Sequence, residues 1–199
     1  MVAPGRVVVI NGTSSAGKTA LAEAFREIRA AAGDCWLVFG IDDFLPRLPR
    51  RWVAYDAWSG SLAGDGVRLV REGDRARYRI GALGHRVLSA YRRSIAEIAR
   101  AGLNVLVDDV TIEEHEWDEW CAALAGLHPV WVALRCDADV AVAREAARGD
   151  RARGLVRGVA DLVHRFPVYD LELDSTATGA ADLAAQLSAY LGEARTPGG

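Results

Sequence analysis

The chain has 199 residues, 51% of them hydrophobic and 26% charged, which suffices to bury the core of one α/β domain but not of two. Its formal net charge of −3 argues against a broad basic surface for nucleic acid or for an anionic membrane, although local basic clusters exist. The three cysteines, Cys35, Cys121 and Cys136, lack the spacing of a disulfide framework or a zinc site. Their apolar neighbours predict buried free thiols in a reducing compartment.

The sequence also shows no segment that approaches the ~20 consecutive apolar residues needed to span a bilayer. The first residues lack the long apolar region of a signal peptide. We therefore expect a cytoplasmic protein that binds neither a membrane nor nucleic acid.

Five short apolar runs predict β-strands, namely Arg6–Asn11, Cys35–Gly40, Leu103–Asp109, Val130–Arg135 and Tyr169–Asp174. The second, third and fourth runs have nearly continuous apolar centres, which is typical of strands that are covered on both faces. The fifth run alternates between apolar and polar residues, so it is expected at an edge of the sheet.

Helical periodicity separates these strands. Three predicted helices have clear limits: Gly17–Ala32, one from a capping box at Thr111–Glu114 to about Leu127, and Asp137–Arg148. Two more are predicted from their apolar faces. The first ends near Gly102 and has Leu83, Val87, Tyr91, Ile95 and Ile98 on this face, and the second, the last in the chain, has Leu183, Leu187 and Leu191. Strands and helices that alternate in this way predict a three-layer α/β fold around a parallel sheet of five strands.

One segment, Pro46–Ile80, interrupts the alternation and contains eight arginines. It is too long for an ordinary connection, so we expect a functional insertion. Val67–Val70 and Arg77–Ile80 within it predict a hairpin. Three aromatic residues of the insertion are candidates either for lining an acceptor pocket or for packing, namely Trp52, Tyr55 and Trp58. We expect one domain over residues 1–193 and a disordered tail over 194–199.

The strongest signal follows the first strand. Its residues match the phosphate-binding pattern GxxxxGK[ST] between a strand and a helix, namely Gly12, Thr13, Ser14, Ser15, Ala16, Gly17, Lys18 and Thr19. Glycines let successive backbone N–H groups converge on a phosphate, and the helix directs its positive end at the same place. Lys18 is the only lysine beside 23 arginines, and a compact charge suits the β- and γ-phosphates in a tight loop. The Thr19 hydroxyl is a candidate ligand for Mg²⁺.

Two further strands end in carboxylates, and in a parallel sheet these ends meet at one edge. Asp108 or Asp109 is expected to hold Mg²⁺, directly or through water, and the sequence does not choose between them. Asp42 is a candidate general base for an acceptor hydroxyl, or alternatively a helix N-cap. Asp43 and Asp109 are additional candidates for contacting the acceptor.

An arginine cluster follows the fourth strand and comprises Arg144, Arg148, Arg151, Arg153 and Arg157. Such arginines either neutralise charge on a transferring phosphoryl group or form salt bridges on a solvated helix. Glycines punctuate the later part, so we expect residues 149–158 to form a lid that closes over the nucleotide.

Taken together, these motifs resemble the chloramphenicol phosphotransferase-like P-loop kinases, which modify antibiotics. The resemblance rests on VINGTSSAGKT (Val9–Thr19), WLVFGID (Trp36–Asp42), ARAGLNVLVDDV (Ala99–Val110), the segment Val130–Gly154 and YDLELDS (Tyr169–Ser175). It implies a phosphate cradle at Gly12–Thr19, Asp42 as general base, and arginines among Arg144, Arg148 and Arg151 that contact the nucleotide.

The resemblance implies an ATP- and Mg²⁺-dependent phosphotransferase whose partner is a hydroxylated small molecule, first of all an antibiotic. Two alternatives stay open: a metabolite or nucleoside kinase on the same scaffold, favoured by the basic insertion if the acceptor is anionic, and a nucleotide-regulated ATPase or binding module. The sequence leaves homo-oligomer formation open.

Overall fold

The structure is a computed structural model that describes residues 2–55, 60–148 and 152–193. Three sequence predictions fall outside these residues: the roles of Trp58 and Arg151, and the tail at 194–199. Residues 149–151, the start of the expected lid, are outside them as well.

The central sheet consists of five parallel strands, as predicted: β1 (Val7–Asn11), β2 (Trp36–Gly40), β6 (Asn104–Asp109), β7 (Val130–Arg135) and β8 (Leu171–Asp174). Their order is β2-β6-β1-β7-β8, so β8 lies at an edge, as its alternation predicted. β2 forms the other edge. Trp36 and Val38 pack on the α1 side of the sheet and Phe39 packs on the α2 side, so both faces of β2 are covered, although the strand is only half-buried after Trp36.

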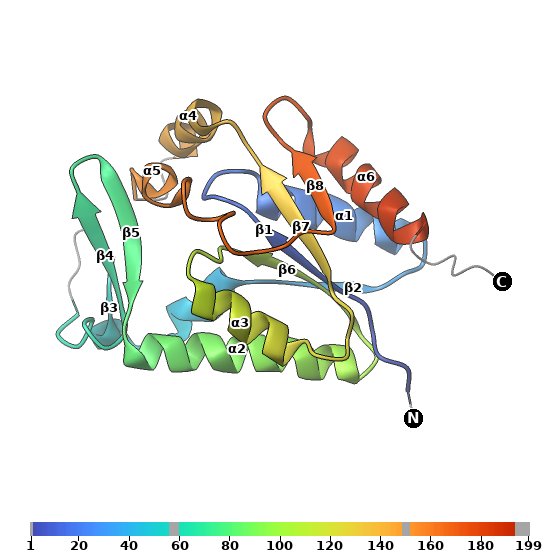
Figure 1. Cartoon of the computed structure of the whole chain (residues 1–199), viewed down its shortest axis with the longest axis horizontal. Helices are drawn as coiled ribbons and strands as arrows, with labels where there is room; N and C mark the ends of the chain where they lie inside the picture. The colour runs from blue at the N-terminus through green and yellow to red at the C-terminus, as the bar shows by residue number, and fades with distance from the viewer. Residues whose placement is uncertain (1, 56–59, 149–151, 194–199) are drawn as a thin grey trace.

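Helices cover both faces of this sheet and complete the three layers (Figure 1). The helices are α1 (Lys18–Ala31), α2 (Ala82–Arg100), α3 (Glu114–Ala123), α4 (Ala138–Arg148), α5 (Leu155–Val159) and α6 (Ala180–Glu193). α1 and α6 pack on one face, and α2 and α3 on the other. Alternate residues of β1 serve the two cores, since Val8 and Ile10 face α1 while Val7 and Val9 face α2 and α3.

The start of α3 differs from the prediction. The capping box is formed by Glu113 and Glu116, not by Thr111 and Glu114, and the helix ends at Ala123. Thr111 instead lies in the preceding loop, where its backbone N–H donates to Asn11 Oδ1 at 2.9 Å. This hydrogen bond fastens the loop between β6 and α3 to the end of β1. Thr111 therefore belongs to the loop and not to the helix.

The expected burial of the cysteines was also wrong. Cys35 and Cys121 are exposed and Cys136 is half-buried, and all three are free thiols. Cys121 lies on a face of α3 that the sheet does not cover, so an apolar neighbourhood in sequence did not imply burial.

The insertion forms a second, smaller sheet of three strands: β3 (Val53–Ala54), β4 (Val67–Glu72) and β5 (Arg75–Ile80). β4 and β5 make the predicted antiparallel hairpin, which stands beside the main sheet in Figure 1. Its base is anchored by a small apolar core of Leu45, Val53, Val67 and Leu88.

The tip of this hairpin packs on α5. Ala76 N–H donates to Gly154 O at 2.8 Å, and Ala76 shares an apolar cluster with Ala152 and Leu155. A Cβ added at Gly158 would lie only 1.8 Å from Ala76 O, so the backbones of α5 and β5 approach too closely for any side chain. Within the residues that the structure describes, no helix is long and apolar enough to cross a membrane.

This close approach predicts that Gly158→Ala lowers the free energy of unfolding by about 1–3 kcal/mol, because the new methyl group forces the hairpin and α5 apart. The loss is expected although alanine is the better helix former. Urea-induced equilibrium unfolding measures it. Gly64→Ala is the matched control, since no atom lies within 4 Å of its added Cβ. Equal stability of the two variants would contradict the close packing.

Candidate active site

The phosphate-binding pattern forms a loop at the centre of the carboxyl edge of the sheet. β1 is the middle strand, hydrogen-bonded to β6 on one side and β7 on the other, and α1 begins directly after the loop. A Cβ at Gly12 would lie 2.6 Å from Leu134 O, so only glycine fits where the loop passes β7. Gly17 has φ +97° and lets the chain enter α1 from a left-handed conformation.

Lys18 is held inside this loop. Its side chain is 6% exposed, and its Nζ donates to Gly12 O at 2.9 Å and to Thr13 O at 3.0 Å. Its third neighbour is Asp108 Oδ1 at 3.6 Å. A buried ammonium group requires such partners, because an unpaired charge away from water is costly.

Asp108 and Asp109 point to opposite faces of β6, and this separates their surroundings. Asp108 lies on the α1 face, where its Oδ2 accepts a hydrogen bond of 2.7 Å from the Thr19 hydroxyl. Asp109 lies on the α3 face and is 1% exposed. Its carboxylate accepts hydrogen bonds from Trp120 Nε1 and from the Thr111 hydroxyl. The structure therefore brings Asp108, but not Asp109, to Lys18 and Thr19.

The loop also contains polar groups without a protein partner. The hydroxyl oxygens of Thr13, Ser14 and Ser15 are buried and make no hydrogen bond within the described part of the chain. Leaving a buried hydroxyl unpaired costs roughly 1–3 kcal/mol, so three together fit a loop built to surround an anion. Thr19 and Asp108 add the hydroxyl and carboxylate oxygens that Mg²⁺ prefers. Among the described residues no group of three or more His, Cys, Asp or Glu side chains could hold a metal.

The two aspartates after β2 have different local roles. Asp42 and Asp43 lie in a single 3-10 turn, Ile41–Asp43, and Gly40 pairs with Asp108 across the sheet. Asp43 is the cap of this turn, since its Oδ2 accepts the Gly40 N–H at 2.7 Å. Asp42 is exposed at the same edge of the sheet as Asp108. Asp43, and not Asp42, therefore caps this turn.

Aromatic residues of the insertion lie near Asp42. The ring of Tyr55 packs edge-on against Tyr78, with centroids 5.5 Å apart. Burial raises the pKa of Tyr55 to about 12, and the neighbouring Tyr78 and the negative charge of Asp42 add to the increase. Trp52 is half-buried, and its backbone lies against Gly66 at the base of the hairpin.

The arginines after β7 separate into distinct environments. Arg144 donates to Ser175 O at 2.7 Å, and the Ser175 hydroxyl donates to Ala16 O at 2.7 Å. Arg144 therefore braces the segment after β8 against the phosphate-binding loop. Arg148 is exposed at the end of α4, and the Arg157 side chain pairs with Asp74 of the hairpin.

A buried carboxylate, which the sequence analysis missed, holds the segment after α4. Glu145 is 4% exposed and accepts hydrogen bonds from Gly154 N–H at 2.7 Å and from Val156 N–H at 2.9 Å. It thus fixes the start of α5. Its position among alanines on a helix gave no sign that two distant backbone groups would bind it.

A second missed feature is a hydrogen-bond network beside the loop. Asn11 Nδ2 donates to Val163 O at 2.6 Å and to the Tyr169 hydroxyl at 2.8 Å. That hydroxyl lies 2.8 Å from His164 Nδ1. Burial, followed by the positive charge of Arg135, lowers the pKa of His164 to about 4, so its ring is neutral at neutral pH. One sign of this network is visible in the sequence, namely the polar residue Asn11 at the end of the apolar run of β1.

The separation of the two aspartates predicts unequal effects on stability. Asp109→Ala is expected to lower the free energy of unfolding by about 1–3 kcal/mol, because it leaves the buried Trp120 N–H and Thr111 hydroxyl unpaired. Asp108→Ala is expected to cost less, since Lys18 keeps two carbonyl partners. Chemical denaturation of both variants measures the difference, and an equal or reversed order would contradict the assignment.

The lowered pKa of His164 predicts that the protein loses stability in acid. Between its ordinary pKa of 6.5 and its folded pKa of about 4, the unfolded chain binds a proton that the folded chain does not. Stability must therefore fall as the pH falls through this range. Urea unfolding at about pH 7.5 and about pH 5 should show a smaller fall for His164→Gln than for the wild type. His128→Asn, at an exposed site, should retain the full fall; a full fall in His164→Gln would contradict the prediction.

Comparisons with known proteins identify relatives in sequence and in fold. The sequence pattern of the family described as chloramphenicol phosphotransferase-like protein matches residues 5–191. Proposed O-phosphotransferases from two strains of Mycobacterium tuberculosis are 32% identical over 191 residues, which cover 92% of this chain and 80% of each relative.

Solved structures show the same fold at lower identity. The APS kinase of Mycobacterium tuberculosis, in complex with AMPPNP and APS, has a TM-score of 0.66 at 16% identity, covering 96% of this chain and 99% of that one. A gluconokinase from Sinorhizobium meliloti has a TM-score of 0.56 at 18% identity, covering 98% and 100%. The fold is therefore that of the P-loop kinases, and the chain belongs to the chloramphenicol phosphotransferase-like family.

Proposed function

We propose that the protein is an ATP-dependent O-phosphotransferase that moves the γ-phosphoryl group to a hydroxyl of a small molecule. The observation that carries the proposal is the loop itself. It combines a buried Lys18, three hydroxyls that have no partner among the described residues, and the Thr19–Asp108 pair at the start of α1. A helix N-terminus and a lysine in a glycine-bounded loop are the features that bind the phosphates of a nucleoside triphosphate.

On the donor side, the loop N–H groups and Lys18 bind the β- and γ-phosphates. Thr19 and Asp108 are the residues that would hold Mg²⁺, which supplies charge neutralisation on the phosphates when bound. Arg148 and Arg151 are proposed to stabilise the transferring group. The segment 152–158, which Glu145 and the hairpin hold in place, is proposed as part of a lid that excludes water.

On the acceptor side, Asp42 accepts the proton of the attacking hydroxyl. The hydroxyl oxygen forms a bond to the γ-phosphorus, and the bond from that phosphorus to the bridging oxygen breaks, so ADP leaves. Asp42 suits this role because it is exposed at the edge where Asp108 lies, while Asp43 provides the local cap.

Two observations favour different classes of acceptor. The family description favours an antibiotic hydroxyl as acceptor. The basic hairpin favours an anionic metabolite as a second candidate, since three arginines lie on one face of β5. We place the reaction in the cytoplasm, where ATP is supplied.

The role of Asp42 is tested with Asp42→Asn. The variant should bind ADP as the wild type does but transfer phosphate about 10²–10⁴-fold more slowly, because the amide cannot accept the proton. ADP release is measured with a panel of hydroxylated antibiotics, nucleosides and sugar derivatives. Asp182→Asn, at an exposed carboxylate of α6, serves as control. Wild-type turnover by Asp42→Asn would remove Asp42 as the base.

A further inference from the structure

The two faces of the hairpin differ in chemistry. Ala76, Tyr78 and Ile80 of β5 face the apolar clusters that pack against the hairpin. The alternate residues Arg75, Arg77 and Arg79 face the other way, opposite Glu72, Val70 and Arg68 of β4. Since side chains alternate along a strand, β5 presents a face that consists of arginines only.

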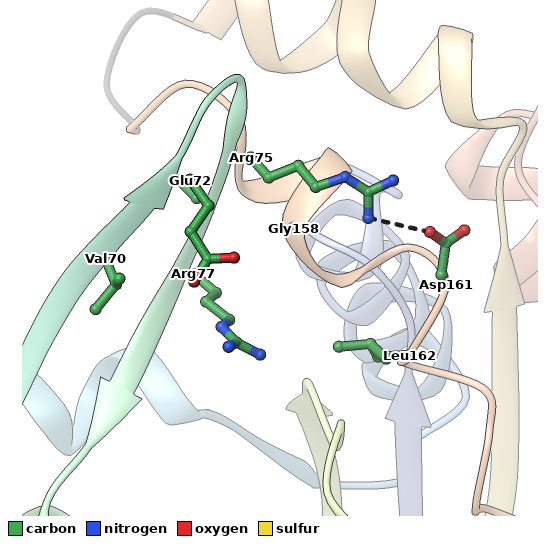
Figure 2. Close-up of a pocket in the computed structure, with 8 residues that line it drawn as sticks. Val70, Glu72, Arg75, Arg77, Gly158, Asp161 and Leu162 are labelled. Atoms are coloured by element: carbon green, nitrogen blue, oxygen red, sulfur yellow. Dashed lines mark hydrogen bonds and ion pairs between the residues drawn. The ribbon is translucent and has the colours of Figure 1, made fainter.

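One cavity, of about 220 Å³, lies between this face and the end of α5 (Figure 2). In it, Arg75 extends to Asp161 and forms an ion pair of 3.3 Å. Arg77 extends in another direction, toward Leu162. The charge of Arg75 is thus compensated here, while Arg77 remains directed at the space between the hairpin and the main domain.

Arg77 also lines a second, larger cavity of about 360 Å³. β5 forms one wall through Arg77, Tyr78, Arg79 and Ile80, and the opposite wall comes from His85 of α2 and the N-terminal turn of α3. This volume is in the range of sites for small molecules.

The charges in this larger cavity are unevenly compensated. Its two acids, Glu113 and Glu116, form the capping box of α3, and Glu116 also lies 3.9 Å from Arg92. Burial lowers the pKa of His85, which keeps this ring neutral near pH 7. The side chains of Arg77 and Arg79, in contrast, make no ion pair or hydrogen bond with the residues that the structure describes. Two arginine side chains without an ion pair to any described residue therefore line the cavity, together with two carboxylates that cap α3.

One residue of the cavity also contacts the aromatic group near the proposed base. Tyr78 lines the cavity, and its ring packs on Tyr55 with centroids 5.5 Å apart. The negative charge of Asp42 contributes to the raised pKa of Tyr55.

We propose that the acceptor carries an anionic group, a carboxylate or a phosphate ester, besides the hydroxyl that is phosphorylated, and that Arg77 and Arg79 bind this group. The proposal rests on the function proposed above. The planar guanidinium groups of arginine bind carboxylate and phosphate oxygens in pairs of charge-assisted hydrogen bonds, and a neutral acceptor lacks the negative charge that strengthens them. The acceptor subsite would thus distinguish anionic from neutral alcohols.

A binding experiment tests the subsite without any turnover. The full chain is saturated with ADP and Mg²⁺, so that its phosphate-binding loop is occupied, and is titrated with inorganic phosphate or with acetate. Arginine Nε–H signals are followed by NMR. Saturable shifts are expected in the wild type and in Arg68→Gln, and a loss of binding in Arg77→Gln and Arg79→Gln. Arg68 is the matched control, because it lies on the same hairpin face but lines neither cavity.

A second experiment compares matched acceptors: glycerate with glycerol, glucuronate with glucose, glucose 6-phosphate with glucose, and nucleoside monophosphates with nucleosides, with chloramphenicol as a neutral antibiotic. The anionic member of a pair should have the higher kcat/KM. Arg77→Gln and Arg79→Gln should lower that value about ten- to hundredfold, mainly through KM, while Arg68→Gln leaves it unchanged. The carboxylate and phosphate arms identify which anion is bound.

The outcomes separate the two proposals. Anion binding that is absent, or equal in all variants, overturns the subsite, as does preferential turnover of the neutral members. If the protein phosphorylates none of these compounds but binds anions through Arg77 and Arg79, the subsite stands and the proposed transfer to these acceptors fails.

Discussion

The single buried ammonium group of Lys18 is the constraint around which the site is organised. With 6% of its side chain exposed, it must be surrounded by oxygen atoms, and it finds them on Gly12, Thr13 and Asp108. Two of these partners belong to the loop itself, whereas Asp108 belongs to β6. The parallel pairing of β1 with β6, Ile10 opposite Asp108, is what delivers that carboxylate. The position of Lys18 thus depends on the register of the sheet.

The same register explains why neighbouring aspartates have different tasks. Alternation along β6 sends Asp108 to the loop and Asp109 into the core beside Trp120. Asn11 ends β1 and binds both the loop after β6 and Tyr169, so the two connections that flank the site are tied to one strand end. A polar layer of this kind orients the loop, because each of its members has a defined partner.

Much of this fold could be predicted from the sequence, because strand and helix periodicity and the glycine–lysine loop are local signals. The five strands, the phosphate-binding loop and the hairpin were found in this way. Contacts between distant residues could not be predicted: Glu145 with Gly154 and His164 with Tyr169 depend on how elements dock. The different partners of Asp108 and Asp109 could not be predicted without the register, since both residues are acidic and adjacent. Cys35 and Cys121 showed that apolar neighbours in sequence do not establish burial.

The proposed donor and acceptor sites are built by different means, a loop in the main sheet and an arginine face on the inserted hairpin. The direct test of the account is to incubate the enzyme with ATP carrying ¹⁸O in its γ-phosphate and with the anionic alcohols, and to weigh each acceptor by mass spectrometry. The account predicts a labelled phosphate ester on a hydroxyl of an anionic acceptor, and none with Lys18→Ala. Label that appears only in inorganic phosphate, whatever acceptor is present, would contradict it.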